Sequence, residues 1–245
     1  SFNSGYAVGT AKPNSLLYVY NADTKKAVWT TYDVNLDSWT KMYLGENPKD
    51  AAELNKNPLF SKYNSAFTYS AEADVKELSD PTISFLRDSI AGSQHYYKIK
   101  IIPNRPVNRY DVFANETMTF YNLKANGVSA LEQKGSIYKR RGKKLVSYYV
   151  VDNEPLELQF SIPVNSVFEM DLMESSFDLI TNPKFRIAKR LPWMIPTPFV
   201  LNDAVVIQKK IIPSNVIRKS DNFKSRNLTP KDSLTVSIDT LKGIQ

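Results

Sequence analysis

The sequence lacks cysteine and has a single histidine, His95, among its 245 residues. These two residue types supply most zinc ligands and many of the general bases and nucleophiles of enzymes. The composition therefore excludes disulfides, cysteine nucleophiles and cysteine-built zinc sites. We expect a chain that is not an enzyme, with no catalytic, cofactor-binding or metal-binding residue. Hydrolysis by carboxylates alone is the enzymatic alternative that this composition leaves open.

Long apolar runs are missing as well. No stretch approaches the roughly 18 apolar residues that indicate a membrane-spanning helix, and no secretory signal peptide opens the chain. The chain starts at Ser1 without a methionine, so we interpret it as a processed or truncated piece. The lack of cysteine is compatible with the cytosol and with the periplasm.

Glycine is scarcer than proline, with 8 against 14, which favours rigid turns and strand ends over flexible linkers. Hydrophobic residues make up 42% of the chain, enough for a sizeable core, and the net charge is +7. A basic surface can bind nucleic acid, anionic lipid or an acidic partner. Because the charge is spread along the chain and no nucleic-acid-binding motif accompanies it, we expect no nucleic acid as a partner.

From residue 81 onward the pattern is almost purely β. Eight short apolar segments, separated by turn residues, predict strands at 82–87, 95–102, 109–113, 118–123, 145–151, 156–162, 168–173 and 199–207. Short strands at this spacing are typical of a sandwich. The predicted fold class is therefore mainly β, an antiparallel β-sandwich with a small N-terminal hairpin-plus-helix element.

That smaller element is predicted from local signals. Residues 16–32 indicate a β-hairpin with turn residues at its centre. Asp37 is placed to cap a short helix over 38–42. Asn47 is placed to cap a second helix over 48–54, which would begin with a proline.

The composition divides the chain into three predicted regions. The N-terminal element (1–80) is packed on the main domain and ends in a polar connector at 71–80. The β-sandwich domain follows (81–212), and then a basic C-terminal tail (213–245). We expect the tail to add a strand at 234–238 or to be partly disordered.

The ionisable residues with catalytic potential all have simpler interpretations. His95 has no second histidine and no adjacent acid in the sequence, so we expect a structural or surface role. Glu169, Asp171 and Glu174 could form a carboxylate cluster for Ca²⁺ or glycoside chemistry. Their spacing fits the solvent face of an amphipathic strand instead. Residues 152–154 fit a turn.

The densest run of positive charge consists of Lys139, Arg140, Arg141, Lys143 and Lys144. We expect a hairpin tip in which Gly142 supplies the turn. Such a tip can contact an anionic membrane surface or an acidic partner, and it is our candidate interaction surface. The alternative is a solvated loop that keeps a sheet edge soluble.

Aromatic residues suggest a sugar-stacking platform built from Trp29, Trp39 and Trp193. In a β-rich chain such residues lie more often in a core or a domain interface. Two segments, 115–117 and 227–229, match the N-glycosylation pattern, which many sequences match by chance.

The stretch RLPWMIPTPFVLNDA (190–204) has three prolines within seven residues, so it is neither a helix nor a central strand. We expect a stiff strap that leads into the last strand, with Asn202 and Asp203 binding local backbone. The stretch resembles the closing segment of the C-terminal, extracytoplasmic domain of membrane-embedded M28-family zinc aminopeptidases of the Bacteroidetes type. The resemblance covers roughly residues 12–212 and includes KPNSLLY (12–18), AVWTTYD (27–33), LDSWTK (36–41), VNRYDV (107–112), YYVVDNEPLEL (148–158) and FDLITNP (177–183).

The resemblance implies a domain order in which a dinuclear zinc peptidase domain comes first, then membrane helices, then a β-rich domain. This chain would be the last of these, a non-catalytic accessory domain whose partners are its own upstream peptidase and membrane domains. Zinc would be bound only in the peptidase domain, and the location would be the periplasmic side of a bacterial membrane, with the tether outside this chain. The zinc-ligand motifs have no counterpart here, so no catalytic residue is carried over. The alternative is an independent periplasmic glycan-binding β-sandwich module, which predicts a row of exposed aromatic residues.

Overall fold

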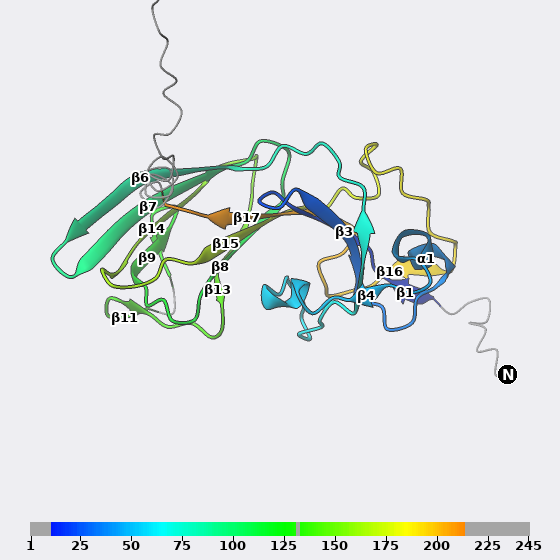
Figure 1. The fold of residues 1–245 in the computed structure, drawn as a ribbon, viewed down its shortest axis with the longest axis horizontal. Helices are drawn as coiled ribbons and strands as arrows, with labels where there is room; N and C mark the ends of the chain where they lie inside the picture. The colour runs from blue at the N-terminus through cyan, green and yellow to red at the C-terminus, as the bar shows by residue number, and fades with distance from the viewer. Residues whose placement is uncertain (1–10, 131–132, 214–245) are drawn as a thin grey trace, which may run out of the picture. The chain divides into compact units, whose positions relative to one another are not determined.

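The computed structural model describes residues 11–130 and 133–213 (Figure 1). The chain divides into two compact units, Ser1–Ile211 and Ile212–Gln245, and the fold below is that of the first. Its described part is mainly β, as the sequence predicts, and has a single α-helix. The strand predicted at 234–238 lies outside the described residues.

Two large sheets carry most of the strands. In the seven-stranded sheet the order is β11 (Gln133–Lys134), β12 (Ile137–Tyr138), β9 (Tyr121–Ala125), β14 (Leu156–Pro163), β7 (Gln94–Ile102) and β6 (Thr82–Ala91), with β10 (Val128–Ser129) beside β9. In the eight-stranded sheet the order is β13 (Lys144–Tyr149), β8 (Arg109–Ala114), β15 (Met170–Ser176), β17 (Ala204–Ile211), β2 (Leu17–Asn21), β3 (Lys26–Thr31), β5 (Tyr69–Ala73) and β4 (Lys49–Asp50). A separate parallel pair consists of β1 (Lys12–Asn14) and β16 (Met194–Pro196).

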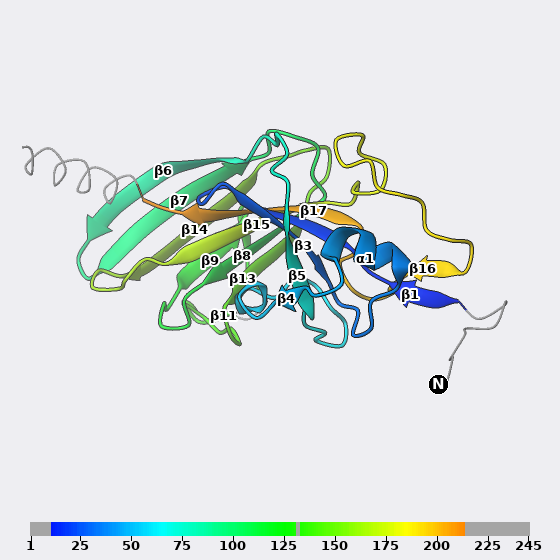
Figure 2. The same cartoon turned by 45° about the vertical axis from the view of Figure 1, so that its right-hand side comes forward.

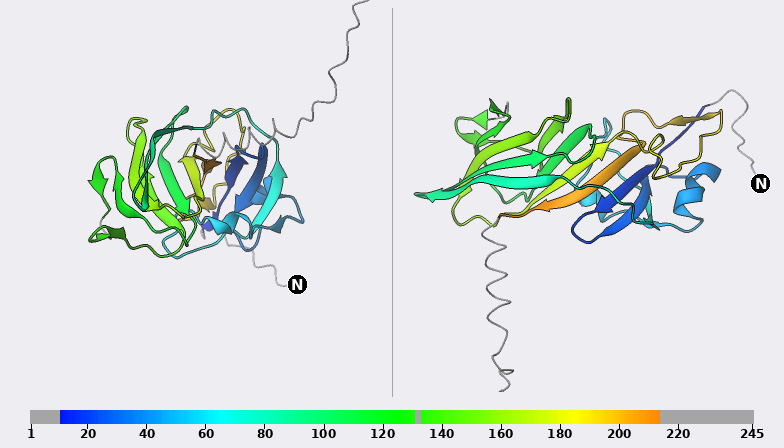
Figure 3. Two further views of the ribbon diagram at one scale, coloured as in Figure 1. Left: turned by 60° about the vertical axis from the view of Figure 1, so that its left-hand side comes forward. Right: turned by 90° about the horizontal axis from the view of Figure 1, so that it is seen from above.

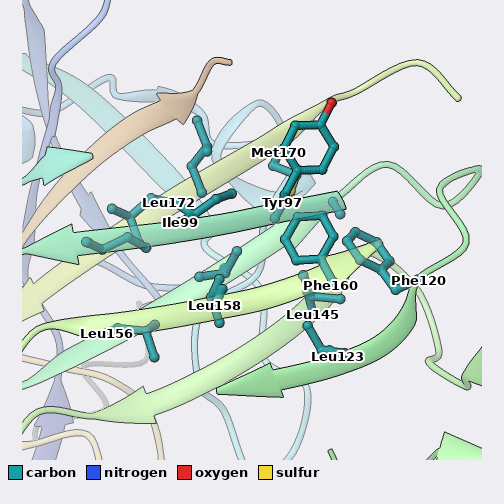
Figure 4. Packing of buried hydrophobic residues seen from close by; sticks show 14 of the residues in the cluster. Tyr97, Ile99, Phe120, Leu123, Leu145, Leu156, Leu158, Phe160, Met170 and Leu172 are labelled. Atoms are coloured by element: carbon teal, nitrogen blue, oxygen red, sulfur yellow. The ribbon is translucent and has the colours of Figure 1, made fainter. Parts of the chain in front are cut away.

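The two large sheets pack face to face through one apolar core (Figure 4). Ile99, Leu158 and Phe160 come from the seven-stranded sheet. Met170 and Leu172, on β15 of the other sheet, pack in the same cluster. Alternate residues of each strand thus point inward, as in a β-sandwich, and this part of the prediction is confirmed.

The predicted N-terminal hairpin is confirmed. Its strands β2 and β3 belong to the eight-stranded sheet, which is also one of the two sheets of the sandwich. At its turn, the side-chain oxygen of Asn21 accepts hydrogen bonds from the backbone N–H groups of Asp23 and Thr24. Lys25 completes the turn with a φ of 59°. Strand β2 pairs in parallel with β17, and Figure 3 shows β17 in orange beside the blue N-terminal strands.

Helix α1 (Ser38–Leu44) is the helix predicted after Asp37. Asp37 accepts hydrogen bonds from the N–H groups of Trp39 and Thr40, and the Thr40 hydroxyl accepts one from the Asp37 N–H, which completes a capping box. Gly45 ends the helix with a φ of 73°. In the described ranges no helix has the length and apolar composition needed to cross a membrane.

The second predicted helix, over 48–54, is wrong. Its first half forms β4, which pairs with Tyr69 and Ser70 of β5. The Asp50 side chain accepts a hydrogen bond from the Ala52 N–H, a local contact that competes with helix formation. Only a short 3₁₀ turn, Leu54–Lys56, follows.

Several strand boundaries also differ from the predictions. The supposed connector at 71–80 begins inside β5. The last strand starts at Ala204 and not at 199, because Phe199 and Asp203 have φ values of 61° and 50°. Residues in this left-handed region cannot continue an extended strand.

Both faces of the N-terminal half of the eight-stranded sheet are covered. Helix α1 packs on β3 and β5 (Figure 2), where Trp39 and Leu44 join an apolar cluster with residues of β2 and β17. On the opposite face, Leu59 and Phe67 from the segment 51–67 pack over the sheet. Strands in this region therefore have few positions that face solvent.

Candidate functional site

His95 lies on β7 and contacts an acid that its sequence neighbours do not include. Its Nε2 is 2.5 Å from Oδ1 of Asp88 on β6, and its Nδ1 is 3.0 Å from the hydroxyl of Tyr97. No acid adjoins His95 in the sequence, but the β6–β7 pairing places Asp88 opposite Tyr97 and so diagonally from His95. Burial raises the pKa of Tyr97, so its hydroxyl stays protonated and serves as a hydrogen-bonding group. The three side chains link two strands.

The three carboxylates predicted on one solvent face do not lie together. Glu169 accepts a hydrogen bond from Asn115 at 2.9 Å, and Asp171 accepts one from Asn57 at 3.2 Å. Glu174 points to the opposite face of the strand, since 174 has the parity of the core residues of β15. Over 11–130 and 133–213, no group of three or more His, Cys, Asp or Glu side chains is placed to hold a metal ion.

Glu174 instead forms an ion pair inside the fold. Nε of Arg105 is 2.8 Å from its Oε1, and the Glu174 side chain is 0% exposed. The Tyr110 hydroxyl donates to Oε2 at 3.3 Å. Arg105 also donates to the backbone carbonyls of Glu174 and Val205, which fixes the β7–β8 loop to β15 and β17. Burial raises the pKa of Glu174, and the attraction of Arg105 only partly offsets this effect.

The basic run is not a hairpin tip. It connects β12 of one sheet to β13 of the other, with Gly142 at a φ of 66°. Lys139 and Arg141 are exposed, whereas Lys143 is half-buried. Lys144 is also half-buried, with Nζ 3.7 Å from Oδ1 of Asp111.

Arg140 is the member of the run that holds the connection together. Its guanidinium donates to four backbone carbonyls, those of Ala114, Asn115, Met118 and Gly142. Burial lowers its pKa. The candidate interaction surface therefore has two exposed cations, Lys139 and Arg141, and one arginine with a structural role.

Arg140→Ala is expected to lower the free energy of unfolding by about 2 kcal/mol, because charged hydrogen bonds to partly buried carbonyls are lost. Arg141→Ala removes the same charge from an exposed position and should change stability by less than about 0.5 kcal/mol. Urea denaturation of both variants measures the difference. Equal stability of the two variants would contradict the structural role of Arg140.

The three tryptophans do not form a row. Trp39 is buried, and its indole N–H donates to the Ala188 carbonyl at 2.7 Å. Trp29 packs edge-on against Tyr18 in the same cluster. Trp193 is 48% exposed. Two of the three residues thus have the core role that the composition favours.

The turn at 152–154 is confirmed and has a second role. Asp152 and Asn153 adopt positive φ values of 50° and 57°. The Asn153 side chain accepts from the Val107 N–H and donates to the Arg105 carbonyl. At 115–117 the Asn115 side chain also makes local turn contacts, whereas 227–229 lies outside the described residues.

The proline-rich strap ties the end of the fold to its beginning. Its β16 pairs with β1, and the Asn202 side chain accepts from the Leu16 N–H and donates to the Asn14 carbonyl. Asn202 also binds locally, to the Asp203 N–H, as predicted. Asp203 forms a bidentate ion pair with Arg190 at 2.6 and 2.8 Å. The long-range contacts of Asn202 were not predictable from its neighbours.

A pocket of about 300 Å³ opens beside β8, at a place that the sequence does not mark. It is lined by Phe60, Arg109, Tyr149, Phe177, Val200, Leu201 and Asn202. Arg109 is buried and forms a bidentate ion pair with Asp111 at 2.8 and 3.0 Å. Burial alone would lower the pKa of Arg109, but the hydrogen bonds and charge of Asp111 raise it. We call this feature the Arg109 pocket.

No protein-family model matches the chain, and no curated protein matches it. Among solved structures, it is similar to the structure of the N-terminal domain of PorA, with 17% sequence identity. The match covers 57% of this chain and 90% of that chain, with a TM-score of 0.22. A similarity of this size carries no argument about fold or function.

Proposed function

We propose that this chain is the non-catalytic C-terminal accessory domain of a membrane-anchored zinc peptidase of the M28 type. In this proposal zinc is bound only by the peptidase domain outside the chain. The domain stands on the periplasmic side of the membrane and packs on its own peptidase domain, shapes substrate access or mediates self-association.

The observation that carries the proposal is how the segments with the family resemblance meet in space. The segment 12–18 and the strap 190–204 are separated by more than 170 residues in the sequence. They contact each other through the β1–β16 pair and through the hydrogen bonds of Asn202 to Asn14 and Leu16. Segments that resemble the family and contact each other in one folded unit support a domain shared with that family better than segments scattered over the structure would.

The placement of the ionisable groups supports a non-catalytic role. Arg105 pairs with Glu174 within the fold, and Arg109 pairs with Asp111. Such pairs fix neighbouring strands and loops relative to one another. Perturbed groups in ion-pair networks are often structural and are no sign of catalysis by themselves.

The test is the reading frame upstream of Ser1, followed by an activity assay. We expect several segments of about 20 apolar residues and a metal-binding domain rich in His, Asp and Glu. The longer protein should release N-terminal amino acids from peptides in a chelator-sensitive manner, and this chain alone should not. A frame with neither feature, or chelator-sensitive aminopeptidase activity of this chain alone, would contradict the proposal.

A further inference from the structure

We propose that the Arg109 pocket binds an aromatic side chain of an extended peptide that carries acidic residues beside it. This inference does not depend on the peptidase assignment, because it is drawn from the pocket alone. Three kinds of observation support it: the aromatic walls of the pocket, the hydrogen bonds that its polar groups already make within the protein, and the positive charge beside it.

The walls of the pocket are aromatic rings that remain accessible to solvent. Phe60 is 39% exposed, Tyr149 60% and Phe177 47%. Exposed apolar groups gathered around a hollow mark binding surfaces more often than scattered ones do. Burial of an aromatic side chain among them removes apolar surface from water, which favours binding. The pocket volume of about 300 Å³ is at the lower end of the usual range for ligand pockets.

The polar groups that line the pocket are largely used within the protein. The amide of Asn202 bonds to the backbone of Asn14, Leu16 and Asp203. Nε and Nη2 of Arg109 are directed to Asp111. A sugar brings hydroxyl groups that must find new partners on burial, and this cost opposes carbohydrate binding. An apolar ring needs no such partners.

A cationic side chain is disfavoured by the charge already present. The guanidinium carbon of Arg109 lies 5.3 Å from the ring centroid of Phe60 and 4.8 Å from that of Tyr149. These two ring faces therefore already interact with a cation. A lysine or a methylated ammonium group in the pocket would meet the positive charge of Arg109.

The charge beside the pocket favours acidic residues next to the anchoring ring. Asp111 is shared by two cations, Arg109 and Lys144. The backbone N–H of Lys62 donates to the carbonyl of Phe199, next to the pocket residue Val200. Its ammonium lies 4.8 Å from the Phe199 ring centroid and forms no ion pair with any residue of the described part. Lys62 is therefore available to a carboxylate of the peptide.

The experiment is a calorimetric or NMR titration of the chain with blocked tripeptides. Ac-Asp-Phe-Asp-NH₂ should bind saturably, and Ac-Asp-Ala-Asp-NH₂ should bind about tenfold or more weakly, since the buried ring is lost. Tyr149→Ala and Phe177→Ala should each weaken the phenylalanine peptide by a similar factor. Tyr149→Phe, which keeps the ring, should retain binding. Trp193→Ala removes an exposed ring that does not line the pocket and should also bind as the wild type does.

The charge component is tested separately. Lys62→Ala should weaken Ac-Asp-Phe-Asp-NH₂ at low salt and lose this effect at high salt, because exposed charge pairs are screened. The proposal is overturned if no tripeptide binds saturably, or if Tyr149→Ala and Phe177→Ala bind like the wild type. It is also overturned if cellopentaose or Ac-Lys-Phe-Lys-NH₂ binds the pocket as tightly. Thermal unfolding of each variant confirms that the chain is folded in the assay.

Discussion

Arg105→Ala is expected to lower the free energy of unfolding by about 3 to 5 kcal/mol, the largest effect of any single substitution that we predict. The substitution removes the cation that faces Glu174 and leaves a carboxylate whose side chain is 0% exposed. An uncompensated buried charge is far more costly than the loss of an exposed ion pair. The contacts of Arg105 with the carbonyls of Glu174 and Val205 are lost as well.

A double variant and a change of pH separate the contribution of the charge from that of the packing. Arg105→Ala combined with Glu174→Gln should be more stable than Arg105→Ala alone, because a neutral amide can still accept from the Tyr110 hydroxyl. Burial already raises the pKa of Glu174, so the Arg105→Ala defect should shrink toward acid pH, where the carboxyl takes up a proton. Urea denaturation at neutral and acid pH, with Arg141→Ala as the exposed control, gives these values. A defect no larger than that of Arg141→Ala would show that the pair is not energetically important.

The sequence was sufficient to predict those structural features that depend on residues close together in the chain. The hairpin turn at Asn21 and the cap at Asp37 involve side chains that bond to backbone two or three residues away. Such contacts depend on residue type and spacing alone. The spacing of short apolar segments, among them 95–102 and 156–162, likewise predicted the sandwich, and these two segments form β7 and β14.

The sequence was insufficient where a second layer covers a sheet. β15 is buried at six of its seven positions, so alternation could not tell which carboxylate would face solvent. Glu174 is buried against a loop more than 60 residues away, and Asn202 bonds to residues at the start of the chain. The Arg109 pocket combines residues from five separate segments. Partners of this kind are fixed by topology, which no local pattern encodes.

Asp33→Asn is expected to stabilise the protein by an amount that grows as the pH rises from about pH 4 to pH 6. Asp33 lies at the end of the hairpin and accepts a hydrogen bond from the Ser15 hydroxyl at 2.8 Å. Burial raises its pKa from 3.8 to about 6, against the hydrogen bonds from Ser15 and Thr31, and the charge of Asp37 raises it further. The folded state therefore binds a proton more tightly at this position than the unfolded chain does.

The sign of the effect follows from this difference in proton affinity. A carboxyl with a raised pKa contributes stability below its unfolded value, and that contribution is lost as the pH rises through the folded value. At neutral pH, Asp33 carries a half-buried charge that asparagine does not, while the asparagine oxygen can still accept from Ser15. Asp33→Asn should therefore stabilise the protein by about 2 to 3 kcal/mol at neutral pH and by much less near pH 4.

The difference in unfolding free energy between the wild type and Asp33→Asn separates the effect of Asp33 from that of groups whose pKa is shifted in the opposite direction. Hydrogen bonds from Asn14 and Thr40 lower the pKa of Asp37 in spite of its burial, so Asp37 contributes stability that is lost toward acid pH. Because this contribution is present in both proteins, most of it cancels when their unfolding free energies are subtracted at each pH. Glu154→Gln, at an exposed position, is the matched control for removing one carboxylate. A wild-type-minus-variant difference that is constant between pH 4 and pH 7, or that grows toward acid, would mean that the folded state does not raise the pKa of Asp33.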